Sequence, residues 1–200
     1  MKGYGTMTVQ QFVIAYEVEQ DKLRAMLPEG FSSLRPVLRI NAEIREDNTI
    51  YLELNTPVSA QKKRGWLNIA HWDNKMTEII CQKNGKTTTF ITPFLTICFT
   101  TVGIEGSCPA EKDNDGCFFI GKSIELRFPE QITANKEFCD CEFAWKFSEN
   151  DAHGISTGKT LPAFATEPKI QYPKQKFTAQ NAAIIPCQQV LGCYAVTFEQ

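Results

Sequence analysis

The sequence predicts a mainly β protein, folded as one antiparallel β-barrel or sandwich domain over residues 1–200, with two or three short helices. About seven to nine segments have alternating or β-rich composition. Most connections between these segments are short, as expected for antiparallel neighbours. A chain of 200 residues with 42% hydrophobic content can also bury one sizeable core, and no low-complexity stretch divides it.

The N-terminal third predicts a strand, a short helix and a hairpin. Residues 4–18 pass from alternation to a continuous apolar run, which is typical of a strand buried on both faces. An acidic start at residues 19–21 precedes three apolar residues on one helix face, and Pro28 and Gly30 would end that helix. Residues 37–45 alternate strictly, and the turn at Asp47 and Asn48 predicts a hairpin with the strand that follows.

That next strand lies in the stretch 49–74, which contains most of the candidate site residues. Alternation places Leu52 and Leu54 on one face of the strand and Tyr51, Glu53 and Asn55 on the other. Glu53 is therefore a strand residue, facing either solvent or a cavity. The pattern by itself favours the solvent face.

A connection over residues 57–64 is expected to lead to a second strand over residues 66–73. Strict alternation would put Trp66 and Asn68 on one face and Leu67, Ile69 and His71 on the other. His71 would then lie one strand away from Glu53. Its unperturbed pKa near 6.5 suits a proton shuttle, although a histidine that bonds a backbone carbonyl is the simpler interpretation.

The rest of the chain continues the β pattern with fewer landmarks. Residues 75–83 have helical spacing, and residues 87–104 predict one long strand or two strands broken near Pro93. A polar loop is expected over 106–116, strands over 117–128 and 137–147 joined as a hairpin, and a turn over 148–158. Residues 159–186 predict long connections with one short helix or strand, and residues 188–199 a final strand.

Composition excludes several classes of partner. The net charge is −2, and no basic block extends beyond Lys62, Lys63 and Arg64, so we expect no nucleic-acid binding. No window approaches the roughly 20 apolar residues that span a bilayer, and the N-terminus lacks the apolar segment of a signal peptide. We therefore expect a soluble, cytoplasmic protein that does not bind membranes.

The eight cysteines are expected to be free thiols, because a chain of this size needs no staples and no export signal is present. No CxxC pair occurs. The two histidines, His71 and His153, are not at ligand spacing from a cysteine pair. We expect neither a metal site nor a cofactor.

Two stretches resemble the acetoacetate decarboxylase-like superfamily. The first is FVIAYEVEQDKLRAMLPEGF, residues 12–31; the second is a Tyr51-x-Glu53 strand, a connection ending in glycine, and an aromatic-aliphatic strand ending in Asp73 and Asn74. The resemblance covers roughly residues 9–75. It implies an antiparallel β-barrel that encloses an apolar cavity, in a homo-oligomer.

The resemblance also implies a chemistry that this chain only partly matches. In the decarboxylases of the superfamily, a desolvated lysine forms a Schiff base with a keto acid. Glu53 matches the acidic cavity residue, which favours a cavity position for it. The arginine of the superfamily falls at or near Val9, and residues 87–90 replace its Tyr-Pro-Lys-Lys motif. Lys83 and Lys86 lie nearby but flank a glycine turn, where water would keep them protonated.

The sequence is compatible with three functions. The first is a protein that binds a small apolar or keto-acid-like ligand in a cavity, with Glu53 as acid, base or hydrogen-bond acceptor and with Tyr51, Asn55 and His71 as ligand contacts. The second is a lyase, specifically a carboxy-lyase, in which Lys86 is a displaced catalytic lysine. The third is a non-enzymatic interaction protein whose barrel is filled by phenylalanine side chains.

Overall fold

The computed structural model describes residues 7–106, 115–121, 123–126, 135–147, 153–155 and 171–199. Within these ranges the elements are β1 (Thr8–Glu17), α1 (Gln20–Met26), β2 (Ser32–Ser33), β3 (Val37–Arg45), β4 (Ile50–Ala60), β5 (Lys63–Asp73), β6 (Ile80–Asn84), β7 (Thr87–Ile91), β8 (Leu95–Gly106), β9 (Cys117–Ile120), β10 (Ser123–Leu126), β11 (Lys136–Trp145), β12 (His153–Ile155), α2 (Ala179–Ala183) and β13 (Gln189–Glu199). No described helix is long and apolar enough to cross a membrane.

All the described strands belong to one sheet. Its order is β10-β9-β5-β4-β3-β1-β13-β11-β8-β7-β6, with β12 beside β11 and β2 beside β4. Neighbours are antiparallel except β5 and β9, which pair in parallel. The mainly β prediction is thus confirmed, while the described strands form an open path rather than the closed barrel we expected, since β10 and β6 are its two ends.

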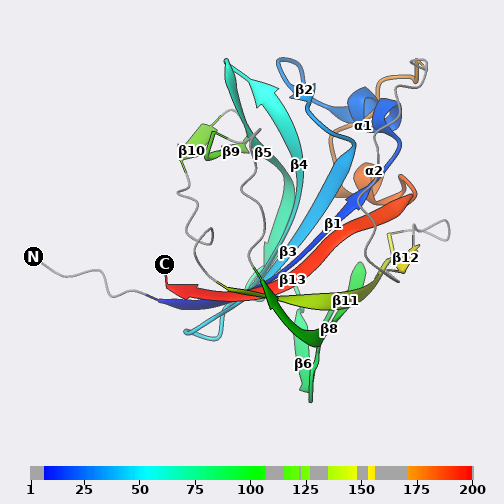
Figure 1. Cartoon of the computed structure of the whole chain (residues 1–200). Coiled ribbons are helices and arrows are strands. Elements are labelled where there is room, and N and C mark those ends of the chain that lie inside the picture. The colour runs from blue at the N-terminus through cyan, green and yellow to red at the C-terminus, as the bar shows by residue number, and fades with distance from the viewer. Residues whose placement is uncertain are drawn as a thin grey trace, which may run out of the picture.

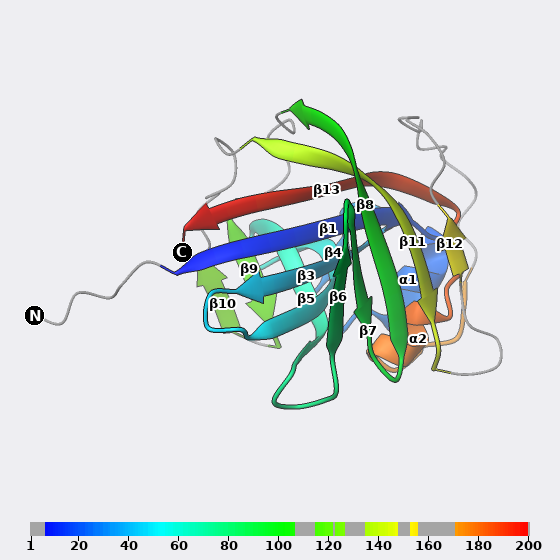
Figure 2. The same cartoon turned by 90° about the horizontal axis from the view of Figure 1, so that it is seen from below.

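The sheet twists strongly and folds back on itself. β1, β3, β4, β5 and β13 run side by side, and Figures 1 and 2 show that β6, β7 and β8 cross this half at a steep angle. The main core lies between the two halves, where Phe12 of β1 packs against Phe90 of β7 and Phe99 of β8, with ring centroids 5.5 and 5.3 Å away. Aromatic side chains therefore occupy the space between the halves in which we expected an apolar cavity.

The two helices cover one end of this core (Figure 1). α1 buries Leu23 and Met26 against it, and α2 buries Ala182 and Ala183. Thr178 caps α2, because its hydroxyl accepts a hydrogen bond from the backbone N–H of Asn181 at 3.2 Å. Both helices are short, so their stability comes from this packing rather than from helix propensity.

Several predicted boundaries agree with the structure and others do not. β3 has the predicted bounds, and β7 and β8 are separated near Pro93 as one alternative proposed. The connection expected over 57–64 is wrong, because β4 and β5 continue to a two-residue turn at Gln61 and Lys62, both with positive φ. The helix expected over 75–83 is also wrong: residues 80–84 form β6, whose backbone pairs with β7.

The later predictions are partly covered by the described residues. The strand expected over 117–128 is divided into β9 and β10 by a turn at Gly121 with φ 57°. A short strand, β12, lies within the turn predicted over 148–158, and α2 lies in the segment 159–186, where one short helix or strand was expected. Most of the polar loop expected over 106–116, most of the connection between the strands expected over 117–128 and 137–147, and the first part of the segment 159–186 lie outside the described residues.

Candidate functional site

Buried polar side chains gather on the face of the sheet opposite the main core. β4 is buried on both faces: Leu52 and Leu54 contribute to the core, and Glu53 leaves by the other face with an exposed fraction of 0%. The solvent position that alternation alone favoured for Glu53 is therefore wrong. We define the polar belt as the buried polar residues of this second face, in strands β1, β3, β4 and β5: Gln11, Asn41, Glu43, Glu53, Asn55 and Asn68.

Glu53 is the centre of the polar belt. Asn41 donates a hydrogen bond from Nδ2 to its Oε1 at 2.6 Å, and Tyr51 donates from Oη to its Oε2 at 3.1 Å. No lysine or arginine among the described residues forms an ion pair with it. A fully buried carboxylate usually has a cationic partner, so within the described part of the chain these two hydrogen bonds are the direct contacts that hold Glu53.

Asn41 connects Glu53 to Arg39. The Nε of Arg39 donates to Oδ1 of Asn41 at 2.8 Å, so the amide accepts from a cation and donates to an anion. The guanidinium of Arg39 also lies over the ring of Trp66 in β5, 4.2 Å from its centroid. This stacking fixes the plane of the guanidinium.

A β-bulge in β5 brings Asn68 and His71 to the same face as Glu53. Leu54 pairs with Ala70, but Asn55 pairs with Asn68, so Ile69 is the extra residue. The strict alternation that we predicted for β5 fails at this point. Asn68 and His71 now lie on one face, and Oδ1 of Asn68 is 3.1 Å from Nδ1 of His71, from which it accepts a hydrogen bond in the tautomer that carries the proton on Nδ1.

Asn55 has an unsatisfied donor at the other end of this group. Its Oδ1 accepts from Nδ2 of Asn68 at 3.0 Å, whereas its own Nδ2 is buried without a hydrogen-bond partner. Leaving a buried N–H unpaired costs about 1–3 kcal/mol. Such a group therefore points to a ligand or water that completes its bonding.

The belt opens to solvent at His71, which is exposed and stacks beside the half-buried ring of Tyr51. On that side Glu43 accepts hydrogen bonds from Gln11 and from Arg45, at 3.1 and 2.8 Å. Of the residues predicted from sequence, Glu53, Tyr51, Asn55 and His71 are thus brought together. Arg39, Asn41 and Asn68 were missed, because an arginine or asparagine within an alternating strand is ordinarily a solvent-facing residue.

Lys86, the predicted catalytic lysine, is not brought to Glu53. It is exposed at the turn between β6 and β7. β7 packs on the sheet face that carries Leu52 and Leu54, whereas Glu53 leaves by the opposite face. The positions where the superfamily has its lysine motif lie in β7, and Phe90 there is fully buried in the core.

A different lysine lies on the Glu53 face. Register partners run across five strands in one row: Phe138, Tyr194, Val13, Asn41 and Glu53. Lys136, at the start of β11, is 8% exposed, and its Nζ lies 4.2 Å from the centroid of the Tyr194 ring. No carboxylate among the described residues pairs with it. The local sequence around Lys136 carries no signal for this position, since β11 joins the row only through long-range pairing.

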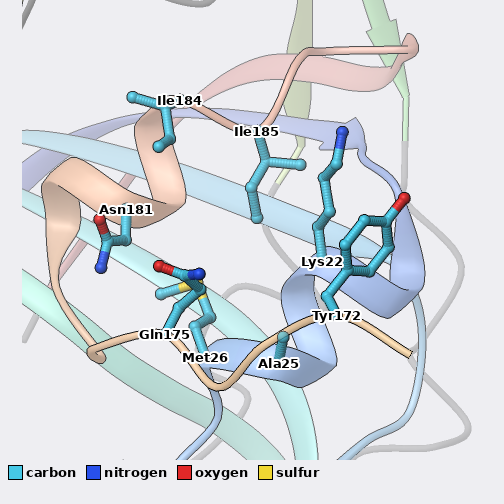
Figure 3. A pocket seen from close by; sticks show the side chains of 8 residues that line it. All are labelled: Lys22, Ala25, Met26, Tyr172, Gln175, Asn181, Ile184 and Ile185. Carbon is cyan, nitrogen blue, oxygen red and sulfur yellow. The ribbon is translucent and has the colours of Figure 1, made fainter. Parts of the chain in front are cut away.

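A separate pocket of about 280 Å³ lies between α1, the segment 171–177 and α2 (Figure 3). Ala25, Met26 and Ile185 line it, with Lys22 and Tyr172 along one side. The Nζ of Lys22 is 2.9 Å from the carboxylate of Glu19, and this hydrogen bond raises the pKa of the lysine. Lys22 therefore stays protonated near neutral pH and is no nucleophile. The pocket does not include the polar belt.

The described cysteines carry free thiols, as predicted. Seven of them are unpaired. No group of three or more histidine, cysteine, aspartate or glutamate side chains in the described ranges could hold a metal ion. Cys193 lies beside Cys139 and Cys141, and burial raises its pKa well above the usual value for a thiol.

No family model and no curated protein matches the sequence. Solved structures do match. Acetoacetate decarboxylase from Legionella pneumophila is similar with a TM-score of 0.56 and 14% identity, over 98% of this chain and 84% of that chain. A second acetoacetate decarboxylase structure gives a TM-score of 0.53 and 13% identity, over 98% and 86%. An acetoacetate decarboxylase-like enzyme from Sphingomonas wittichii gives 0.50 and 10%, over 97% and 89%.

These structural matches extend over nearly the whole chain, and they agree with the resemblance seen in residues 9–75. At identities of 10 to 14% they concern the fold and not the activity. The chain has the acetoacetate decarboxylase-like fold.

Proposed function

We propose that this protein binds a small keto-acid-like molecule at the polar belt, with Glu53 as the residue that accepts or transfers a proton. The observation that carries the proposal is a fully buried carboxylate held by two hydrogen bonds, with no cationic partner in the described ranges. Because an uncompensated buried charge is costly, it is kept where function requires it. The unsatisfied Nδ2 of Asn55 supports the same conclusion.

The two groups complement each other chemically. Each oxygen of Glu53 accepts one hydrogen bond in the free protein, so each can accept another from a ligand. Asn55 lies two residues further along the same face of β4, about 7 Å away along the strand. It would donate to a carbonyl oxygen while Glu53 exchanges a proton with a neighbouring carbon or hydroxyl group.

We propose further that this chemistry proceeds without a Schiff base. A lysine forms an imine only as the neutral amine, and shifting its pKa from about 10.4 to about 6 requires roughly 6 kcal/mol against the charged form. Lys86 is exposed at a turn, where water stabilises the ammonium ion. The superfamily's lysine position carries threonine or phenylalanine instead.

Ligand binding tests the first part of this proposal. Isothermal titration of 2-oxobutanoate into the wild type should show binding, and Glu53→Gln should change its dissociation constant by about tenfold or more. Glu29→Gln is the matched control, since Glu29 is exposed beyond α1. Equal affinities for the wild type and Glu53→Gln would refute the role of Glu53.

A second candidate function, a carboxy-lyase that uses a displaced lysine, is favoured by the burial of Lys136 on the Glu53 face. Borohydride reduction in the presence of acetoacetate, followed by intact-mass and peptide analysis, separates the two functions. The absence of an adduct supports imine-free chemistry. An adduct on Lys136 would establish the second candidate, and one on Lys86 would establish the lysine predicted from sequence.

A further inference from the structure

We propose that Arg39 and Asn55 form a subsite for a single carboxylate group beside Glu53, so that the ligand is a short monoanionic carboxylic acid with a second polar group. This inference rests on the proposed function, because it defines the substrate class of the same site. Two sets of donors on neighbouring strands, neither with a protein partner among the described residues, carry it.

The first set belongs to Arg39. Its Nε is used by Asn41, and its guanidinium is stacked over Trp66. Within the described part of the chain, the two terminal nitrogens donate to no group, and no carboxylate forms an ion pair with them. Arg39 is half-buried, so a ligand can reach it from solvent. Arginine held in a fixed plane is preorganised for a planar, two-oxygen acceptor.

The second set belongs to Asn55, the direct register partner of Arg39 across β3 and β4. Side chains of such partners leave the same face of the sheet, with Cβ atoms about 5 Å apart. The Oδ1 of Asn55 is occupied by Asn68, which fixes the amide and leaves Nδ2 as its only free atom. Both free sets are therefore donors, and they lie on adjacent strands.

Because both sets are donors, the ligand group that binds them must be an acceptor. The charges of Arg39 and Glu53 determine the charge that this group can carry. Arg39 and Glu53 carry opposite charges and are linked through Asn41, so a ligand with one negative charge would pair with Arg39. A dianion such as phosphate would add a second negative charge close to the buried carboxylate of Glu53. A carboxylate also matches the fork of the guanidinium with both oxygens.

This subsite orients the ligand along β4. The carboxylate would lie at Arg39 and Asn55, and the remainder of the molecule would extend toward Glu53 and Tyr51. A carbonyl or hydroxyl group a few atoms away from the carboxylate would then reach Glu53. The inferred class is a short oxo or hydroxy acid.

The test compares a carboxylate with its neutral amide in the same protein. Isothermal titration should show that the wild type binds 2-oxobutanoate about tenfold or more tightly than 2-oxobutanamide. Arg39→Gln should remove this preference, and Arg39→Lys should keep part of it, because lysine retains the charge but not the fork. Arg24→Gln, which changes an exposed arginine of α1, should leave the preference unchanged.

The outcomes distinguish the subsite from the proposed function. If the wild type binds the acid and the amide equally, or if Arg39→Gln keeps the full preference, the subsite is wrong while binding at Glu53 stands. If neither compound binds the wild type, both proposals fail. Loss of the preference in Arg39→Gln, with thermal unfolding unchanged and the amide still bound, supports the subsite.

Discussion

The hydrogen bond between Asn41 and Glu53 allows a quantitative test of whether the buried carboxylate is charged. The two side chains are 1% and 0% exposed, and Nδ2 lies 2.6 Å from Oε1. A hydrogen bond to a charged group contributes about 1.5–3 kcal/mol, and one between neutral groups about 0.5–1.5 kcal/mol. Leucine is similar in shape to asparagine but cannot donate this bond. Asn41→Leu in an otherwise wild-type protein should therefore lower the free energy of unfolding by about 2 kcal/mol.

The same substitution should cost about 1 kcal/mol when Glu53 is replaced by glutamine, because the acceptor is then neutral. The assay is urea unfolding at pH 8 of the wild type, Asn41→Leu, Glu53→Gln and the double variant. We expect a coupling energy of about 1 kcal/mol from this cycle. Additivity within about 0.3–0.5 kcal/mol would mean that no charge-assisted bond exists, and the argument for a charged Glu53 would fail.

Three further predictions concern the sheet and the thiols. Gly65→Ala should destabilise the protein in urea unfolding, because the added Cβ would lie 2.0 Å from the carbonyl oxygen of Cys117 in β9. Gly192→Ala should have little effect, because no atom lies within 4 Å of the position of its Cβ. Equal destabilisation by the two substitutions would contradict this prediction. Burial raises the pKa of Cys187 to about 11 and that of Cys193 well above its usual value. Because the unfolded thiols ionise near pH 8.5, the stability they contribute is complete below that pH and should fall as the pH rises above it; unfolding free energies that stay constant from pH 8 to 10 would exclude this. For the same reason Cys193 should react slowly with iodoacetamide at pH 7.5 until urea unfolds the protein, as peptide mass analysis would show.

The lysines show why the proposed function depends on the structure. The sequence favours Lys86 because this residue lies close to the position of the superfamily's lysine motif. In the structure Lys86 lies at the turn between β6 and β7, on the side of the sheet opposite to Glu53. Lys136 lies 83 positions after Glu53 and is nevertheless on the same face, because each strand of the row pairs with its neighbour in space rather than in sequence.

Local patterns predicted the elements that depend on few neighbours. The alternation of β3 and the turn after it predicted that strand with its observed bounds, because a hairpin is specified by its own side chains. The apolar spacing at Leu23 and Met26 likewise predicted α1. The helix prediction for residues 75–83 was wrong because their helical spacing was weak, and the backbone of residues 80–84 pairs with β7 instead.

The sequence by itself determined a mainly β fold and placed Tyr51, Glu53 and Asn55 on one face of one strand, since alternation is a property of the strand alone. Only the tertiary structure decided that this face is buried, that Ile69 forms a bulge which turns His71 toward Glu53, and that Arg39 lies opposite Asn55. These features depend on register and on pairing between distant segments. No local pattern contains that information, because the free energy that selects a register comes from contacts formed only when the whole sheet assembles.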